Sequence, residues 1–170
     1  MVEFRVQIFS KTQPSGNKER DMSALDDIYN FLPLSNSLAT SGQPSQEQMV
    51  EIAKAGFQVV INLGLSKADY ALEDEAGLVK SLGMAYVHIP VLWEAPGKVD
   101  LESFFGVMET HCEKRVYVHC AANMRVSTFV ALYRILRLGW ERETAFRDVY
   151  RIWTPDERWQ SFIKEMLQSA

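Results

Sequence analysis

Residues 116–128 have the sequence VYVHCAANMRVST, and this segment indicates both the fold of the chain and the position of its reactive residues. The apolar run Val116–His119 predicts a short buried strand that ends just before Cys120. Small residues follow, and a helix is predicted to begin near Arg125. A strand that leads through a tight loop into a helix turns free backbone amides toward one concavity, which attracts anions. The segment therefore predicts an oxyanion-binding loop.

Two reactive side chains belong to this loop. The positive end of a helix favours the thiolate form of a cysteine, so Cys120 is the candidate nucleophile, although most free cysteines are simply buried apolar residues. Arg125 can grip two oxygens of a tetrahedral anion, the alternative being a surface salt bridge. Ser127 or Thr128 could hydrogen-bond the sulfur and ease its departure. The loop residues expected to contact the anion are Ala121, Ala122, Asn123 and Met124.

Strands alternate with helices on both sides of this segment. The expected strands are 37–40, 57–63, 85–91 and 116–119, and the expected helices are 45–55, 68–81, 100–111, 124–138, 142–152 and 155–168. A capping box of Ser45 and Gln48 begins the first helix, and Thr154 is the expected N-cap of the last. This alternation predicts an α/β fold with a largely parallel central sheet flanked by helices, in which ligands bind at the carboxyl ends of the strands.

Composition indicates one soluble domain with an N-terminal appendage. The appendage is residues 1–22, a short alternating strand over 1–9 followed by a polar loop, and the main domain is 23–170. With 18 basic and 22 acidic residues, the net charge of −4 gives no electrostatic reason to expect nucleic acid or an anionic membrane as partner. No apolar run approaches the ~18 residues of a membrane span, and Glu3 and Arg5 interrupt any signal-peptide core, so we expect a cytoplasmic protein.

The cysteines and histidines do not form a metal-binding pattern. Cys112 and Cys120 are too few for a disulfide framework, and Cys112 is expected to be structural, the alternative being a resolving thiol for Cys120. His88 and His111 do not cluster with carboxylates or cysteines at ligand spacing. We therefore predict no metal and no cofactor.

The pattern His119-Cys120-(four residues)-Arg125 after an apolar strand resembles the signature loop of cysteine-dependent protein tyrosine and dual-specificity phosphatases. The likeness extends upstream and covers roughly residues 30–168. The further similar stretches are LATSGQP at 38–44, AGF at 55–57 before VVINL at 59–63, and YVHIPV at 86–91. They look like a bacterial group related to dual-specificity phosphatases whose domains also occur fused to a metallo-hydrolase linked to sulfide metabolism. The resemblance implies a phosphatase fold and a phosphorylated protein or a small phosphoester as substrate.

The loop departs from the phosphatase signature in its length. That signature places five residues between the cysteine and the arginine, and this chain has four, none of them glycine. Asn123 is the loop residue best able to adopt a left-handed conformation in place of glycine. If no residue was lost, Val126 occupies the arginine position; if one was lost, Arg125 is the arginine and the cradle is tighter. Four residues is also the spacing of rhodanese-type sulfurtransferase loops, which carry a persulfide.

A general acid is the second part of a phosphatase. The resemblance implies an Asp a few residues after the strand at 85–91, and none lies directly there. Glu94 is the nearest carboxyl group, and Asp100 is the other, although Asp100 fits a helix cap better. His119 is expected to orient the loop by hydrogen bonding rather than to act as a base. Three functions follow: a phosphatase that forms a phosphocysteine, a weak pseudophosphatase that binds an oxyanion, or sulfur transfer at Cys120.

Overall fold

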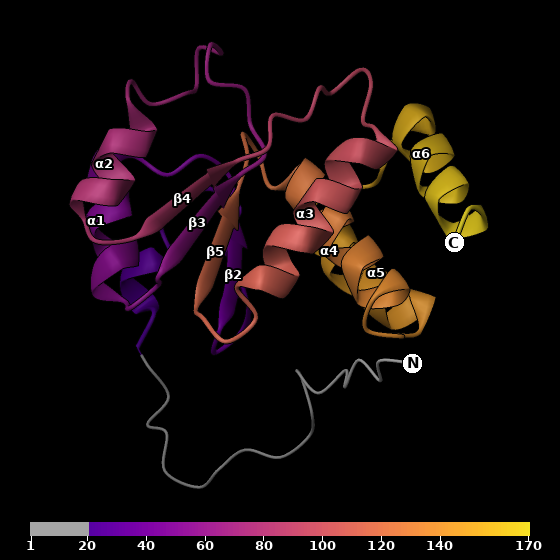
Figure 1. The fold of residues 1–170 in the computed structure, drawn as a ribbon, viewed down its shortest axis with the longest axis horizontal. Coiled ribbons are helices and arrows are strands. Elements are labelled where there is room, and N and C mark those ends of the chain that lie inside the picture. Colours follow the sequence, from indigo (N-terminus) through magenta and orange to yellow (C-terminus); the bar gives the residue numbers. More distant parts are fainter. Residues whose placement is uncertain (1–20) are drawn as a thin grey trace, which may run out of the picture.

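The computed structural model describes residues 21–170, which form a five-stranded sheet with helices on both faces (Figure 1). The strands are β1 (Leu32–Ser35), β2 (Leu38–Ser41), β3 (Val59–Asn62), β4 (Ala85–His88) and β5 (Val116–His119). Their order is β1-β2-β5-β3-β4, and all pairs are parallel except β1 with β2. The predicted α/β class with a largely parallel sheet is confirmed. The predicted strand at 1–9 lies outside the described residues.

Strand β1 was not predicted from the sequence. It contains Pro33, which has no backbone N–H and which argues against a strand. In the structure β1 is an edge strand that pairs only with β2, so the missing donor costs little. The hairpin of β1 and β2 thus closes one edge of the parallel sheet.

The helices divide into two groups, one on each face of the sheet (Figure 1). One face carries the 3₁₀ turn η1 (Ser23–Leu25), α1 (Gln46–Lys54) and α2 (Glu75–Ser81). The other carries α3 (Lys98–Thr110), α4 (Met124–Leu136), α5 (Arg142–Ile152) and α6 (Glu157–Gln168). Among the described residues, no helix is long and apolar enough to cross a membrane.

Strand β5 contributes to both cores because its side chains alternate between the two faces. Tyr117 packs in the core on the α1 and α2 side. Val118 and Cys120 pack in the core on the α3 to α6 side. His119 therefore lies on the same side as Tyr117, beneath α2, and Cys120 lies on the opposite side.

Several element boundaries differ from the sequence-based prediction. The helix expected over 68–81 is only α2, because Asp74 adopts a left-handed conformation (φ 47°) and its side chain accepts a hydrogen bond from the amide of Gly77, which fixes the start there. Strand β4 ends at His88, because Pro90 cannot continue the ladder. The N-cap of α6 is Asp156 rather than Thr154. The capping box of Ser45 with Gln48 at α1 is confirmed.

Candidate active site

Cys120 lies at the carboxyl end of the central strand β5, between β2 and β3. Its side chain is buried, with 1% of its surface exposed. The chain then turns through Ala121, Ala122 and Asn123 into α4. Asn123 has φ 63° and ψ 5°, so its predicted left-handed conformation is confirmed. An asparagine thus makes the turn without the glycine of the phosphatase signature.

The outer side of this loop is held by two hydrogen bonds to its carbonyl groups. The amide of Gln43 donates to the carbonyl oxygen of Ala121 (3.1 Å), and the Asn30 side chain donates to that of Ala122 (3.0 Å). Because a peptide plane points its N–H opposite its C=O, the amide of Ala122 turns away from Gln43. Within residues 21–170, no group accepts a hydrogen bond from the amides of four loop positions: Ala121, Ala122, Met124 and Arg125. These donors are available to an oxyanion.

Arg125 follows this loop in the first turn of α4 and is buried, with 5% of the residue exposed. Its Nη1 donates to the carbonyl oxygen of Val91 (2.7 Å), and its Nη2 donates to the hydroxyl of Tyr70 (3.2 Å). A guanidinium has five N–H donors, so three remain for a ligand. Two contacts from separate loops therefore fix the orientation of the guanidinium and leave enough donors for a bidentate grip.

Ser127 has a different partner from the one predicted. Its hydroxyl donates to the carbonyl oxygen of Met124 (3.1 Å), as does the hydroxyl of Thr128 (3.1 Å). Within the described chain, no hydrogen bond joins Ser127 to the sulfur of Cys120. The hydroxyl groups satisfy the first turn of α4, because polar side chains near a helix start readily bond to nearby backbone groups.

The two candidate acids lie on the segment between β4 and the first turn of α3. Glu94 is exposed in the loop. Asp100 lies in the first turn of α3, and its Oδ2 accepts from the amide of Gly97 (3.1 Å), because the helix begins two residues earlier than predicted. Asp100 thus caps the helix from inside it. In the described part of the chain, neither carboxylate hydrogen-bonds residues 120–125.

The loop that carries Glu94 is anchored by Trp93. The Trp93 ring packs against Trp153 and Trp159, with ring centroids 5.3 Å and 5.2 Å apart. These two partners lie at the end of α5 and at the start of α6. Helices α5 and α6 therefore support the loop that carries Glu94.

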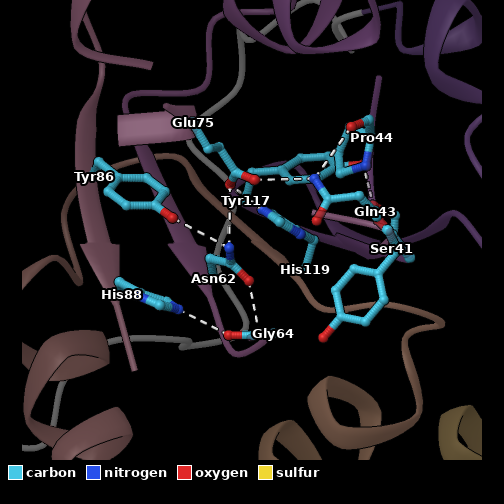
Figure 2. Close-up of polar contacts among 12 residues, drawn as sticks. Ser41, Gln43, Pro44, Asn62, Gly64, Glu75, Tyr86, His88, Tyr117 and His119 are labelled. Carbon is cyan, nitrogen blue, oxygen red and sulfur yellow. Dashed lines mark hydrogen bonds and ion pairs between the residues drawn. The ribbon is translucent and has the colours of Figure 1, made fainter. Parts of the chain in front are cut away.

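His119 forms a buried pair with Glu75 of α2 (Figure 2). Its Nε2 lies 2.6 Å from Oε1 of Glu75, and the side chains are 0% and 5% exposed. Burial raises the pKa of the Glu75 carboxyl, but the hydrogen bond and charge of His119, with the hydrogen bond from Gln43, outweigh it and hold that pKa below its usual 4.5. Glu75 is therefore ionised at neutral pH.

The same carboxylate influences Tyr86 on β4. Burial and the nearby charge of Glu75 raise the pKa of the Tyr86 hydroxyl to about 12, so this hydroxyl stays neutral. It accepts a hydrogen bond from Nδ2 of Asn62 (3.1 Å). Figure 2 shows these groups converging between β3, β4 and β5.

Sequence reasoning missed Glu75 and Tyr70 as parts of the site. Glu75 stands in the acidic run LEDEAG at 72–77, inside the helix predicted over 68–81, and no motif distinguishes it from its solvated neighbours. Tyr70 falls in a stretch predicted to be helical and has no motif around it. Only the tertiary structure brings them to the loop, since the paired residues Asn62 of β3 and His119 of β5 are 57 positions apart in the sequence.

No metal centre is evident in the part of the chain that the structure describes. It contains no group of three or more His, Cys, Asp or Glu side chains that could hold an ion.

Comparisons with known proteins show the family and the fold of this chain. The family described as "DSP-PTPase phosphatase fused to NAD+ Kinase" matches residues 19–164. A curated relative, the beta-lactamase hydrolase-like protein of Xylella fastidiosa (strain Temecula1), is 27% identical over 109 residues, which is 62% of this chain and 25% of that protein. The chain thus spans about a quarter of the length of the curated relatives it matches.

Solved structures give the same fold. A protein of Shewanella putrefaciens CN-32 described provisionally as a phosphatase (DUF442) is 32% identical, with a TM-score of 0.79 over 88% of this chain and 98% of that one. A variant of P. aeruginosa TpbA in complex with phosphotyrosine is 15% identical, with a TM-score of 0.64 over 82% of this chain and 89% of that one, and shows similarity of fold alone.

Proposed function

The chain belongs to the family of DSP-PTPase phosphatases fused to NAD+ kinase, and on this premise we propose that it is a cysteine-dependent phosphatase that hydrolyses phosphate monoesters. The observation that carries the proposal is the arrangement around Cys120. A buried thiol at the end of the central strand is followed by unpaired amides and by the buried guanidinium of Arg125. Together they can hold a phosphoryl group against the sulfur.

The reaction has two steps. The thiolate of Cys120 attacks phosphorus, an S–P bond forms, and the P–O bond of the ester breaks while the leaving oxygen takes a proton from a carboxylic acid. Water then attacks the phosphocysteine, the S–P bond breaks, and phosphate leaves as the thiolate is restored and the carboxyl regains a proton. Arg125 and the loop amides stabilise the charge on the equatorial oxygens in both steps.

We assign the acid to Glu94 in preference to Asp100. The carboxylate of Asp100 is engaged with the amide of Gly97, whereas Glu94 is exposed on the loop that also contains Val91. Val91 is itself hydrogen-bonded to Arg125, which ties this loop to the anion site. General acid catalysis contributes roughly 10²–10⁴-fold, mostly for poor leaving groups.

The proposed substrate is a phosphorylated protein or a small phosphoester. TpbA, which shares the fold, has been captured with phosphotyrosine, and this supports a phosphoryl group on a side chain as one candidate. The tests below use an aryl phosphate because it requires no knowledge of the natural alcohol.

Substitution of the nucleophile tests the proposal. Cys120→Ser is expected to abolish hydrolysis of p-nitrophenyl phosphate while binding of vanadate or phosphate survives, since a serine hydroxyl keeps the shape but is a far poorer nucleophile at neutral pH. Cys112→Ser is the matched control, because Cys112 lies just beyond the end of α3, before the amino end of β5, whereas Cys120 follows the carboxyl end of that strand. Unchanged turnover in the Cys120 variant would exclude covalent catalysis by this residue.

The loop length supports a second candidate function, sulfur transfer. Four residues separate Cys120 from Arg125, the spacing of rhodanese-type loops. In that reaction the thiolate attacks the outer sulfur of thiosulfate, sulfite leaves, and cyanide removes the bound sulfur as thiocyanate. Parallel assays with the aryl phosphate and with thiosulfate plus cyanide distinguish the two activities. Binding of phosphate without either turnover would identify a pseudophosphatase.

A further inference from the structure

We propose that Glu75 is the positioning residue of the anion loop. It orients His119, the residue before Cys120, by direct contact. It also orients Arg125, at the other end of the loop, through Asn62, Gly64 and Tyr70. The inference rests on the proposed function, because it assigns a role to this loop in phosphoryl transfer. Glu75 does not touch the expected ligand and acts through other residues.

The carboxylate of Glu75 contacts hydrogen-bond donors at or just beyond the carboxyl ends of three parallel strands, β2, β3 and β5 (Figure 2). His119, the last residue of β5, contacts Oε1 at 2.6 Å, and Asn62, the last residue of β3, donates more weakly to the same atom at 3.4 Å. Gln43, two residues beyond β2, donates to Oε2 at 3.0 Å. One buried anion thus cross-links the strand ends from which the active-site loops start.

The pairing also determines the proton position on His119. An ionised carboxylate only accepts hydrogen bonds, so Nε2 of His119 carries the hydrogen that faces Glu75. Within the described chain, Nδ1 of His119 is buried without a partner. A single charge-assisted contact with Glu75 thus holds the ring. This contact fixes the position of His119 at the end of β5, immediately before Cys120.

A second chain of hydrogen bonds leads from Asn62 to Arg125. Oδ1 of Asn62 accepts from the amide of Gly64 (2.7 Å), and the next amide, that of Leu65, donates to the hydroxyl of Tyr70 (2.8 Å). The same hydroxyl accepts from Nη2 of Arg125 (3.2 Å). Both ends of the Cys120–Arg125 loop are therefore connected to the same carboxylate.

Fold stability alone does not account for this pair. Replacing a buried polar or charged pair by apolar side chains of similar volume is often neutral or stabilising, because taking such groups out of water is costly. The pair instead orients two residues: His119, which precedes the nucleophile, and Tyr70, which contacts Arg125. A displacement of catalytic groups by about 1 Å can cost about 100-fold in rate.

Glu75→Gln tests the proposal with little change in shape. The new amide must present its NH₂ toward either His119 or Gln43, and both are donors, so one contact is lost. We expect kcat for p-nitrophenyl phosphate to fall by about 10-fold or more, towards the roughly 100-fold that a misplacement of about 1 Å can cost. Glu73→Gln is the matched control, since it removes the same charge from an exposed position two residues away; it is expected to behave as wild type.

Transposing the charge separates positioning from folding. In the double variant Gln43→Glu with Glu75→Gln, the amide at 75 can donate to the new carboxylate while its oxygen accepts from His119. We expect this variant to recover at least part of the lost kcat. A double variant that folds as well as wild type yet stays at the level of Glu75→Gln would overturn the proposal, as would a Glu75→Gln variant with wild-type kcat.

Two measurements are independent of phosphatase activity. Nitrogen-15 spectra of the imidazoles, of which the chain has three, are expected to show His119 with hydrogen on Nε2 in the wild type and a changed signal in Glu75→Gln. The pH profile of Cys120 labelling by iodoacetamide is expected to shift in the same variant. If the aryl phosphate is not hydrolysed at all, the proposed function fails while these readouts still decide the role of Glu75. A wild-type spectrum with hydrogen only on Nδ1 would refute that role.

Discussion

Gly42 lies against the anion loop, and its replacement by alanine is the sharpest test of how closely the loop is packed. An added Cβ would lie 2.7 Å from the carbonyl oxygen of Ala121 and 2.8 Å from a ring carbon of Tyr29. Ordinary contact begins at 3.4 Å, so the Ala121 carbonyl or the Gly42 backbone must move by about 0.7 Å. The Ala121 carbonyl also accepts from Gln43 and adjoins Cys120, so its movement displaces the nucleophile.

The expected effects of Gly42→Ala are on both stability and catalysis. Overpacking of this kind costs about 1–3 kcal/mol, which lowers Tm by roughly 2–12 °C in a domain of this size. A misplacement of about 1 Å can cost about 100-fold in rate, so we expect kcat/KM for the aryl phosphate to fall about 10-fold or more. Thermal unfolding followed by circular dichroism and steady-state kinetics measure the two effects.

Gly106→Ala is the matched control. Gly106 is exposed in the middle of α3, and an added Cβ would meet nothing within 4 Å. Alanine is favoured over glycine in a helix by about 1 kcal/mol, so Tm is expected to rise and kcat/KM to stay unchanged. If Gly42→Ala matched this control in both measurements, the close packing of Gly42 on the loop would be wrong.

Three further predictions concern charged residues. Arg125→Lys should weaken vanadate binding about 10–100-fold, because a single ammonium group cannot contact Val91, Tyr70 and a ligand at the same time. Equal affinities of the two proteins in a titration would place Arg125 outside the anion site. Glu94→Gln should slow hydrolysis of alkyl phosphates more than that of aryl phosphates, whereas Asp100→Asn should mainly lower Tm; the reverse pattern would exchange their roles. The folded-state pKa of Glu75 lies below 4.5, so the stabilisation from its ionised form is present above about pH 4.5 and is lost as the pH falls through the lowered pKa. In urea unfolding from pH 7 to pH 3, the free energy of unfolding of the wild type should therefore fall more steeply than that of Glu75→Gln. Parallel curves for the two proteins would contradict this.

The sequence predicts the parts of this molecule that depend on local patterns. Buried strands such as β3 and β5 are short apolar runs between glycines or polar turns, and α1 has its capping box and a stop at Gly56 (φ 87°). The left-handed Asn123 follows from the absence of glycine in a loop that must turn sharply. These features are local, so their signals lie within a few residues.

The rest depends on contacts between distant segments. Glu75 looks like a solvated residue until α2 packs over β3 and β5, where His119 and Gln43 reach it. Tyr70 reaches Arg125 across 55 positions of sequence. Edge strand β1 escapes prediction because its Pro33 is tolerated only at a sheet edge, and the edge is a property of the whole sheet.

The tryptophan cluster gives the protein an optical reporter of its own. Three of its four tryptophans are Trp93, Trp153 and Trp159, whose rings lie 5.2–6.0 Å apart, while Trp140 stacks separately beneath Arg134. Any ligand that shifts the loop of Trp93 changes the surroundings of all three rings at once. Intrinsic fluorescence in a Trp140→Phe background would therefore follow that loop in a stopped-flow instrument, in real time and without an attached dye.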